Sequence, residues 1–208
     1  SLSESLLAAK KNKIQIALVL GGGNIYRGRE LTSLNIDQVS ADYIGMLSTI
    51  MNGIALSNFL SSNNCENSLF SSFAIGNFLK AYRKEEAEKS LVEDKIVILV
   101  GGLGNPLFTT DSTASVRAVE LNSDVMLKAT NVDGVYSDDP KVNKEAIKYE
   151  HLSFDEAITK NLKVMDQTSL CFCRDNNLSV RVFNADAEGA ILEAIINENT
   201  DIGTLVEL

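Results

Sequence analysis

Two short apolar runs, each followed at once by glycines, constrain the fold of this chain most strongly. Residues Ile96–Val100 form a mostly β-branched run, long enough for a buried strand and too short for a helix, and GGLG follows at 101–104. Residues Ile14–Leu20 form a similar run that ends in GGGN at 21–24. Glycine enters backbone regions that are closed to residues with a Cβ, so both patterns predict a strand that ends in a tight loop. We therefore expect an α/β fold in which the two glycine loops line one crevice.

The stretch after the second glycine loop predicts an anion site. Capping residues at 109–112 (TTDS) precede apolar residues at helical spacing, Ala114, Ala118 and Leu121, and so predict a helix that begins there. A strand, a glycine turn and a helix N-terminus aim free backbone N–H groups at an anion. A second strand, Val125–Ala129, leads into the polar loop 130–136. Ligands lie beyond the carboxyl ends of strands in open α/β sheets, so we expect a ligand site built from two loops.

The rest of the chain reads as alternating helices and strands without a linker, which predicts one domain over residues 1–208. We expect helices over 1–12, 42–59, 80–95, 153–160, 166–176 and 188–197, strands over 68–73 and 180–183, and a loop over 35–41.

The composition excludes several classes of protein. A net charge of −9 and a pI near 4.7 argue against a nucleic-acid-binding protein, which usually needs a basic face. No apolar run reaches membrane length and no signal peptide opens the chain, so we expect no membrane partner. The three cysteines form neither a disulfide framework nor a CxxC pair, and a single histidine leaves little scope for zinc chemistry. We predict a cytoplasmic protein without a metal site of its own.

Several side chains allow two interpretations. Asp111 and Asp42 each stand where a helix is expected to begin, so each could be a helix cap. Beside a phosphate, Asp111 could instead orient a lysine or a metal-bound nucleotide, and Asp42 could accept ribose hydroxyl protons. Tyr136 could belong to the core or could stack on a base. Lys128 and Lys163 are the cations closest to the loops.

The common nucleotide motifs are absent from the sequence. Neither the Walker pattern GxxxxGK[ST] nor GxGxxG occurs, so neither a P-loop fold nor a dinucleotide fold is supported. Cys171 and Cys173 are expected to fill the core. The residues alone predict an α/β protein that binds a phosphorylated ligand.

Six strings, in this order, resemble a known family. They are GGGNIYRG (21–28), ADYIGMLSTIMNGIAL (41–56), GNPLFTTD (104–111), LKATNVDGVYSDDP (127–140), LKVMD (162–166) and RVFN (181–184). Together they closely resemble the bacterial uridylate (UMP) kinases of the amino-acid-kinase fold, and the likeness runs over almost the whole chain. Acetylglutamate, carbamate and aspartate kinases share that fold without these strings.

The resemblance implies phosphoryl transfer from ATP to UMP, giving UDP and ADP in pyrimidine nucleotide biosynthesis. It implies a three-layer α/β/α sandwich with a mainly parallel central sheet, assembled as a homohexamer that GTP activates and UTP inhibits. Magnesium would be held mainly through the nucleotide phosphates.

The family motifs also assign residues by position. UMP would be bound by Gly22, Asp42, Leu103, Gly104, Asn105, Pro106, Leu107, Phe108, Thr109 and Thr110. ATP would be bound by Gly23, Arg27, Thr130, Asn131, Tyr136 and Asp139. Asp111, Asp166 and Arg27 would organise the reacting groups.

The sequence departs from the family in two ways. Leu103 replaces a threonine, which removes a hydroxyl near the nucleotide, and Leu107 replaces a phenylalanine. The family also begins with a strand that carries a Lys-x-Ser-Gly motif, and no residue here matches it. We expect either that this segment precedes residue 1 or that the chain is a truncated form lacking its first strand. A form without that lysine would lose about 10³-fold or more in rate.

Two alternatives to UMP kinase activity therefore stay open at this point. One is a nucleotide-binding oligomer that is catalytically impaired. The other is a different amino-acid-kinase member that acts on a carboxylate or a carbamate.

Overall fold

The predicted strand Ile96–Val100 is β3, the central strand of a three-stranded parallel sheet. All five of its residues are buried, as its apolar, β-branched sequence requires. It pairs on one side with β1 (Ala17–Val19) and on the other with β2 (Asn67–Ser71). Because the three strands are parallel, their carboxyl ends, at Val19, Val100 and Ser71, lie at one edge of the sheet.

The computed structural model describes residues 2–26, 35–140, 142–197 and 200–208. The described chain divides into two compact units. Unit A comprises residues 15–113, and unit B comprises residues 1–14 with residues 114–208. The single domain expected from the sequence stays a prediction.

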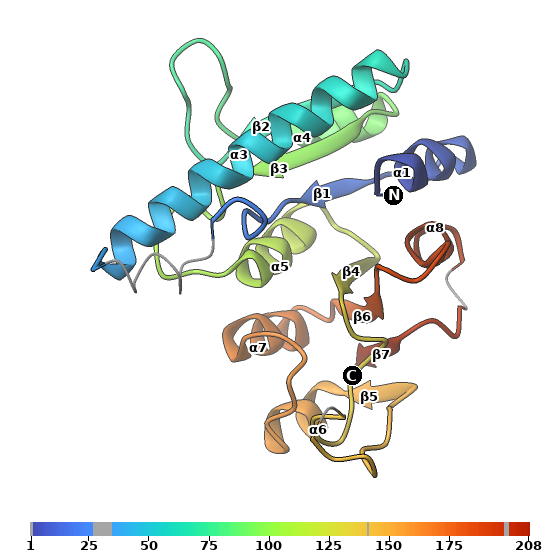
Figure 1. The fold of residues 1–208 in the computed structure, drawn as a ribbon. Coiled ribbons are helices and arrows are strands. Elements are labelled where there is room, and N and C mark those ends of the chain that lie inside the picture. Colours follow the sequence, from blue (N-terminus) through green and yellow to red (C-terminus); the bar gives the residue numbers. More distant parts are fainter. Residues whose placement is uncertain (1, 27–34, 141, 198–199) are drawn as a thin grey trace. The chain divides into compact units, whose positions relative to one another are not determined.

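Unit A has three layers, because helices cover both faces of its sheet (Figure 1). The long helix α3 (Gln38–Ser62) packs on the face that carries Asn67, whose side-chain amide donates to the main chain of Ser57. Helix α4 (Lys84–Val92) packs on the opposite face, where the hydroxyls of Ser90 and Ser68 share a hydrogen bond. Asn67 and Ser68 are consecutive in β2, and consecutive strand residues point to opposite faces.

Helix α3, with 25 residues, is by length and composition alone long and apolar enough to cross a membrane, although polar residues interrupt its apolar pattern. It is the one such helix among the described residues. Its buried face includes small and polar residues, Ser48, Thr49 and Gly53, as well as Ile50 and Leu56, and it packs on β2 and β3. Helix α3 therefore packs on the sheet of unit A along one face.

The sheet of unit B has four strands, in the order β4-β6-β7-β5. The predicted strands are present as β4 (Val125–Thr130) and β6 (Ser179–Asn184), and they pair in parallel over their full lengths. Two short strands, β5 (His151–Ser153) and β7 (Thr204–Glu207), were not predicted. Strand β7 is antiparallel to β6 and parallel to β5, so the sheet is mixed.

Two hydrophobic clusters cover the two faces of the unit B sheet. One face carries Met126, Val180 and Val182, which pack with residues of α6 (Phe154–Thr159) and α7 (Gln167–Asp175). The other face carries Leu127 and Phe183, which pack with residues of α8 (Ala190–Ile196). Helix α8 in turn contacts α1 (Leu2–Ala9), which a short 3-10 turn, Lys10–Asn12, extends. Unit B is therefore also layered, with helices on both faces of a mainly parallel sheet.

Two predicted helix boundaries were wrong. Helix α3 begins at Gln38, because the side chain of Asp37 accepts a hydrogen bond from the Ser40 N–H at 3.0 Å and caps the helix there. Asp42 therefore lies inside the helix and does not cap it, and residues 38–41, expected in a loop, are helical. The helix expected over 80–95 is only α4, because residues 80–82 run beside β2. Helix α5 (Thr110–Glu120) begins within one residue of its prediction.

Candidate nucleotide site

Helix α3 holds the loops that follow β1 and β3. The loop after β1 approaches α3 so closely that a Cβ on Gly22 would lie 2.7 Å from the carbonyl oxygen of Gly45 and 2.8 Å from the Cβ of Ser48. Only glycine allows this contact. The side-chain amide of Asn52 in α3 donates to the carbonyl of Gly21 at 2.8 Å and pairs with the Asn24 amide. The GGGN loop is thus held against one helix.

The glycine loop after β3 is held by the same helix. The N–H of Gly101 donates to the hydroxyl of Thr49 in α3 at 2.7 Å. Gly101 has a φ of 78°, and a Cβ there would lie 2.7 Å from the hydroxyl oxygen of Ser71 at the end of β2. The hydroxyl of Ser72 also donates to the carbonyl of Gly102. All three strand ends of unit A therefore contribute to one loop cluster.

Asp42 links α3 to the far end of this loop. One of its carboxylate oxygens accepts from the N–H of Leu107 at 2.7 Å, and the other accepts from the side-chain amide of Gln38 at 2.7 Å. Leu107 has a φ of 70°, which is unusual for a residue with a Cβ. Its side chain and that of Phe108 are both exposed. Asp42 thus fixes the backbone of the 103–110 segment.

Unit A therefore gathers the residues that the family motifs assign to UMP. Gly22, Asp42 and the 103–110 segment all lie around the first half of α3 or at the carboxyl edge of its sheet. Asp111 follows in the first turn of α5, where it is half-buried. Gly23 lies in the loop after β1, and Arg27 lies outside the described residues.

Unit B gathers most of the residues assigned to ATP in the loop that follows β4. The hydroxyl of Thr130 accepts from the N–H of Val132 and donates to its carbonyl, both at 2.9 Å, so the chain turns sharply after Asn131. The hydroxyl of Tyr136 donates to a carboxylate oxygen of Asp133 at 2.7 Å, and the ring is half-buried. Tyr136 is therefore not a core residue.

Hydrogen bonds around Asp139 follow this loop. The carbonyl of Asp139 accepts from the N–H groups of Val142 and Asn143, and its own N–H donates to Asp138. Hydrogen bonds from the Asn143 amide and the Asp139 N–H, with the charge of Lys163, hold the pKa of Asp138 below its ordinary value. Lys163 itself is exposed, and Lys128 is half-buried in β4.

Asp166 is the N-cap of α7. Its carboxylate accepts from the N–H of Ser169 at 2.9 Å and from the Ser169 hydroxyl at 2.7 Å. The capping role follows from its position, and a carboxylate oriented in this way can also face a ligand. In the part of the chain that the structure describes, no group of three His, Cys, Asp or Glu side chains is placed to hold a metal ion.

Three supporting residues were missed by the sequence analysis. Thr49, Asn52 and Ser72 hold the two glycine loops, yet none belongs to a glycine string. Thr49 and Asn52 could have been found as polar residues inside the apolar pattern of a long helix. Nothing in the sequence marks Ser72, because its contact depends on how β2 ends.

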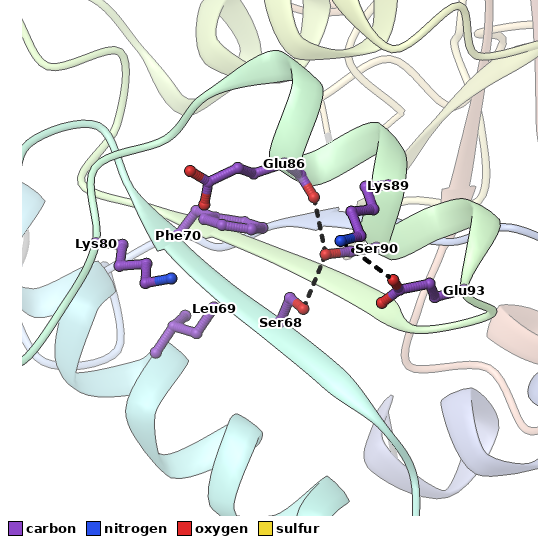
Figure 2. Close-up of a pocket in the computed structure, with 8 residues that line it drawn as sticks. All are labelled: Ser68, Leu69, Phe70, Lys80, Glu86, Lys89, Ser90 and Glu93. Atoms are coloured by element: carbon purple, nitrogen blue, oxygen red, sulfur yellow. Dashed lines mark hydrogen bonds and ion pairs between the residues drawn. The ribbon is translucent and has the colours of Figure 1, made fainter.

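A separate hollow of about 430 Å³ opens beside β2, and Figure 2 shows its lining. The Ser90 hydroxyl donates to the main chain of Glu86 and shares a hydrogen bond with the Ser68 hydroxyl, and Lys89 pairs with Glu93 at 3.7 Å. Lys80 also lines it. None of the predicted site residues that the structure describes lines this hollow.

The chain is similar to known proteins in both sequence and structure. The model of the Amino acid kinase family matches residues 1–184. The uridylate kinase of Coxiella burnetii is 46% identical over 194 residues, which span 93% of this chain and 79% of that protein. Among solved structures, the UMP kinase of Bacillus anthracis has a TM-score of 0.93 at 38% identity, over 99% of this chain and 84% of that one. The UMP kinase of Ureaplasma parvum also has a TM-score of 0.93, at 39% identity, over 100% of this chain and 87% of that one.

Proposed function

The chain belongs to the amino acid kinase family, and we propose that it transfers the γ-phosphoryl group of ATP to UMP, giving UDP and ADP in pyrimidine nucleotide biosynthesis. The observation that carries the proposal is its similarity, over almost the whole chain, to uridylate kinases. The arrangement of the glycine loops on α3 supports it, because those loops carry the strings typical of the uridylate kinases.

UMP is proposed to bind at the loop cluster of unit A. Gly22 and the 103–110 segment supply backbone that can approach the nucleotide closely. The carboxylate of Asp42 accepts a hydrogen bond from the Leu107 N–H, and its remaining acceptor positions can also bind a ribose hydroxyl. Leu103 offers no hydroxyl, so we expect the main chain to make the polar contacts there.

ATP is proposed to bind the loop after β4, together with Gly23 and Arg27. Thr130, Asn131, Tyr136 and Asp139 would contact the nucleotide, with the Tyr136 ring beside the base. An arginine is well suited to phosphate because its planar fork donates two parallel hydrogen bonds.

The chemistry needs little from the protein beyond positioning. The UMP phosphate is itself the nucleophile, and near neutral pH it needs no strong base, which fits a chain with one histidine. Asp111 and Asp166 would orient the reacting groups, and Arg27 would offset the charge that moves between the phosphates.

Magnesium fits this site as an ion carried by the nucleotide. Mg²⁺ is usually bound through one or two carboxylates plus substrate phosphates, with several waters retained. The described residues offer single carboxylates, Asp111 and Asp166, and no cage. When bound, the ion would neutralise part of the phosphate charge.

A coupled assay for ADP release tests the activity, with ATP and Mg²⁺ present and UMP as the acceptor. We expect turnover with UMP, UDP as the product, and no turnover with N-acetylglutamate or carbamate. Turnover with a carboxylate or carbamate in place of UMP would assign a different reaction of the family. Tight binding of UMP and ATP with no UDP formed would identify a nucleotide-binding protein without catalysis.

Self-association, as a homohexamer, is proposed to use the exposed face of α3. Apolar side chains recur there at helical spacing and stay in contact with solvent in the single chain: Val39, Tyr43, Leu47, Met51 and Phe59. Light scattering on wild type and Met51→Lys tests this, and Val92→Lys on α4 is the control because Val92 is also exposed. We expect only Met51→Lys to reduce the mass. A cytoplasmic location and responses to GTP and UTP remain predictions.

A further inference from the structure

The loop that follows β4 contains a carboxylate that the family motifs do not assign. Asp133 lies between Thr130, which turns the chain, and Tyr136, which we place at ATP. Its side chain is more than half exposed, yet both of its oxygens have a partner. One oxygen accepts from the Tyr136 hydroxyl at 2.7 Å, and the other lies 3.9 Å from the ammonium of Lys148.

The main chain around Asp133 is held on both sides. On one side, the Val132 N–H donates to the Thr130 hydroxyl. On the other side, the Val135 N–H donates to the hydroxyl of Thr204 in β7 at 2.8 Å, and its carbonyl accepts from the Tyr149 N–H at 2.9 Å. The backbone of the loop therefore fixes where the Asp133 side chain begins, and this limits the positions its carboxylate can take.

The hydrogen bond to Asp133 restricts the Tyr136 ring. A tyrosine has two side-chain torsions, and its hydroxyl lies at the far end of the ring, so holding the hydroxyl fixes χ1. Tyr136 and Lys148 are also bridge partners in an antiparallel pairing, which brings the ammonium group to the same carboxylate. This ammonium offsets the negative charge of Asp133, which would otherwise repel a polyphosphate.

We infer that Asp133 is a positioning residue for the nucleotide, which fixes the Tyr136 ring beside the base while Lys148 offsets its charge. The inference deepens the proposed ATP site and rests on it. The hydrogen bond from Tyr136, partial burial and the charge of Asp133 together raise the pKa of the Tyr136 phenol, which gives the contact a spectroscopic signature in solution.

Calorimetric binding of adenylyl imidodiphosphate, a non-hydrolysable ATP analogue, tests this inference without any need for turnover. We expect Asp133→Ala and Tyr136→Phe each to weaken its binding by about threefold to tenfold, the effect of roughly one partly exposed hydrogen bond. The double variant should be no weaker than the weaker single variant, because both remove one interaction. Asp133→Asn keeps an acceptor for the hydroxyl and should bind within about twofold of wild type.

Two readouts separate positioning from a structural role. UMP affinity should not change in any of these variants, and an ultraviolet titration should show one phenol with a lower pKa in Asp133→Ala than in wild type. Tyr149→Phe is the matched control, because it removes a hydroxyl that is paired with Lys160 and lies outside the proposed site. It should change neither affinity.

Several outcomes would overturn the inference. They are an unchanged analogue affinity or phenol titration in Asp133→Ala, equal losses of analogue and UMP affinity, additive losses in the double variant, or a wild type that does not bind the analogue. A wild type that binds the analogue and forms no UDP would refute the proposed function alone, and the same affinities would still decide the role of Asp133.

Discussion

Replacing Gly22 with alanine should damage the UMP site, because Gly22 lies against the backbone of α3. The new Cβ would lie 2.7 Å from the Gly45 carbonyl oxygen, whereas ordinary contacts begin at 3.4 Å. The loop must therefore move away from α3 by about 0.7 Å (3.4 minus 2.7). Overpacking of this kind typically costs about 1–3 kcal/mol of stability.

The displaced loop should weaken catalysis with UMP. A shift approaching 1 Å in a positioning element can cost up to about 100-fold in rate, so we expect kcat/KM for UMP to fall by roughly 10- to 100-fold in Gly22→Ala. Initial rates at varied UMP and saturating ATP measure this, and a thermal melt measures the loss of stability.

Gly21 supplies the matched control for this experiment. A Cβ on Gly21 would meet no atom within 4 Å, although the two glycines are adjacent in the chain. Gly21→Ala should therefore keep both the rate and the melting temperature close to those of wild type. Equal behaviour of the two variants would refute the argument that close approach to α3 makes Gly22 necessary.

Three further predictions concern helices α3 and α7. Gly53→Ala should destabilise unit A by about 1–3 kcal/mol in urea unfolding, because the new Cβ would lie 2.5 Å from Val100 Cγ1. Gly45→Ala should instead stabilise α3 by about 0.5–1 kcal/mol, because its Cβ would meet no atom within 4 Å. Stability changes of the same sign in the two variants would contradict this. Asp166→Ala should lose about 1 kcal/mol of stability, because it removes the cap of α7, and it should also lose most turnover. Asp37→Ala removes an equivalent cap from α3 and should lose stability but keep turnover in the coupled assay. Similar losses of rate in the two variants would refute a catalytic role for Asp166. Hydrogen bonds from Ser40 hold the pKa of Asp37 below its ordinary 3.8, so the charged carboxylate stabilises the fold at neutral pH. This contribution is lost as the pH falls through the lowered pKa, so the difference in unfolding free energy between wild type and Asp37→Asn should shrink below about pH 4. A difference that grows there would contradict the assignment.

The elements that the sequence predicted well are those whose signal is local. Strand β3 consists of five buried apolar residues, and in an α/β protein such a run is typical of a strand that lies between two others in the sheet. The starts of α7 and α6, expected at 166 and 153, also depend on residues within four positions of each other. The side chains of Asp166 and Ser153 accept from the N–H groups of Ser169 and Glu156.

The elements that were missed depend on partners that are distant in the sequence. Strand β7 contains Thr204, Glu207 and only two apolar residues, and it is defined by pairing with β6, more than 20 residues earlier. Strand β5 is three residues long and begins with His151. Such short strands carry too little pattern to be read from one sequence.

Side-chain roles were harder to predict than elements. Asp42 and Asp37 are both plausible caps five residues apart, and only the structure distinguishes them, because Asp37 bonds the Ser40 N–H and Asp42 bonds Leu107, 65 positions away. Tyr136 was ambiguous because its surroundings include Lys148, which arrives from the next segment of chain. The family strings assigned these positions to a ligand without giving the contacts that hold them in place.

Helix α3 contacts the glycine loops on one face and presents apolar side chains on the other. One face contacts the loop at Gly22 and holds both glycine loops through Thr49 and Asn52, while its other face carries the exposed apolar residues. If copies of the chain associate through that outer face, assembly and UMP binding involve the same helix. Thermodynamic linkage is reciprocal, so any preference of the assembled form for UMP must equal the preference of the UMP-bound form for assembly. The concentration of the protein would then help to set its apparent affinity for its own substrate.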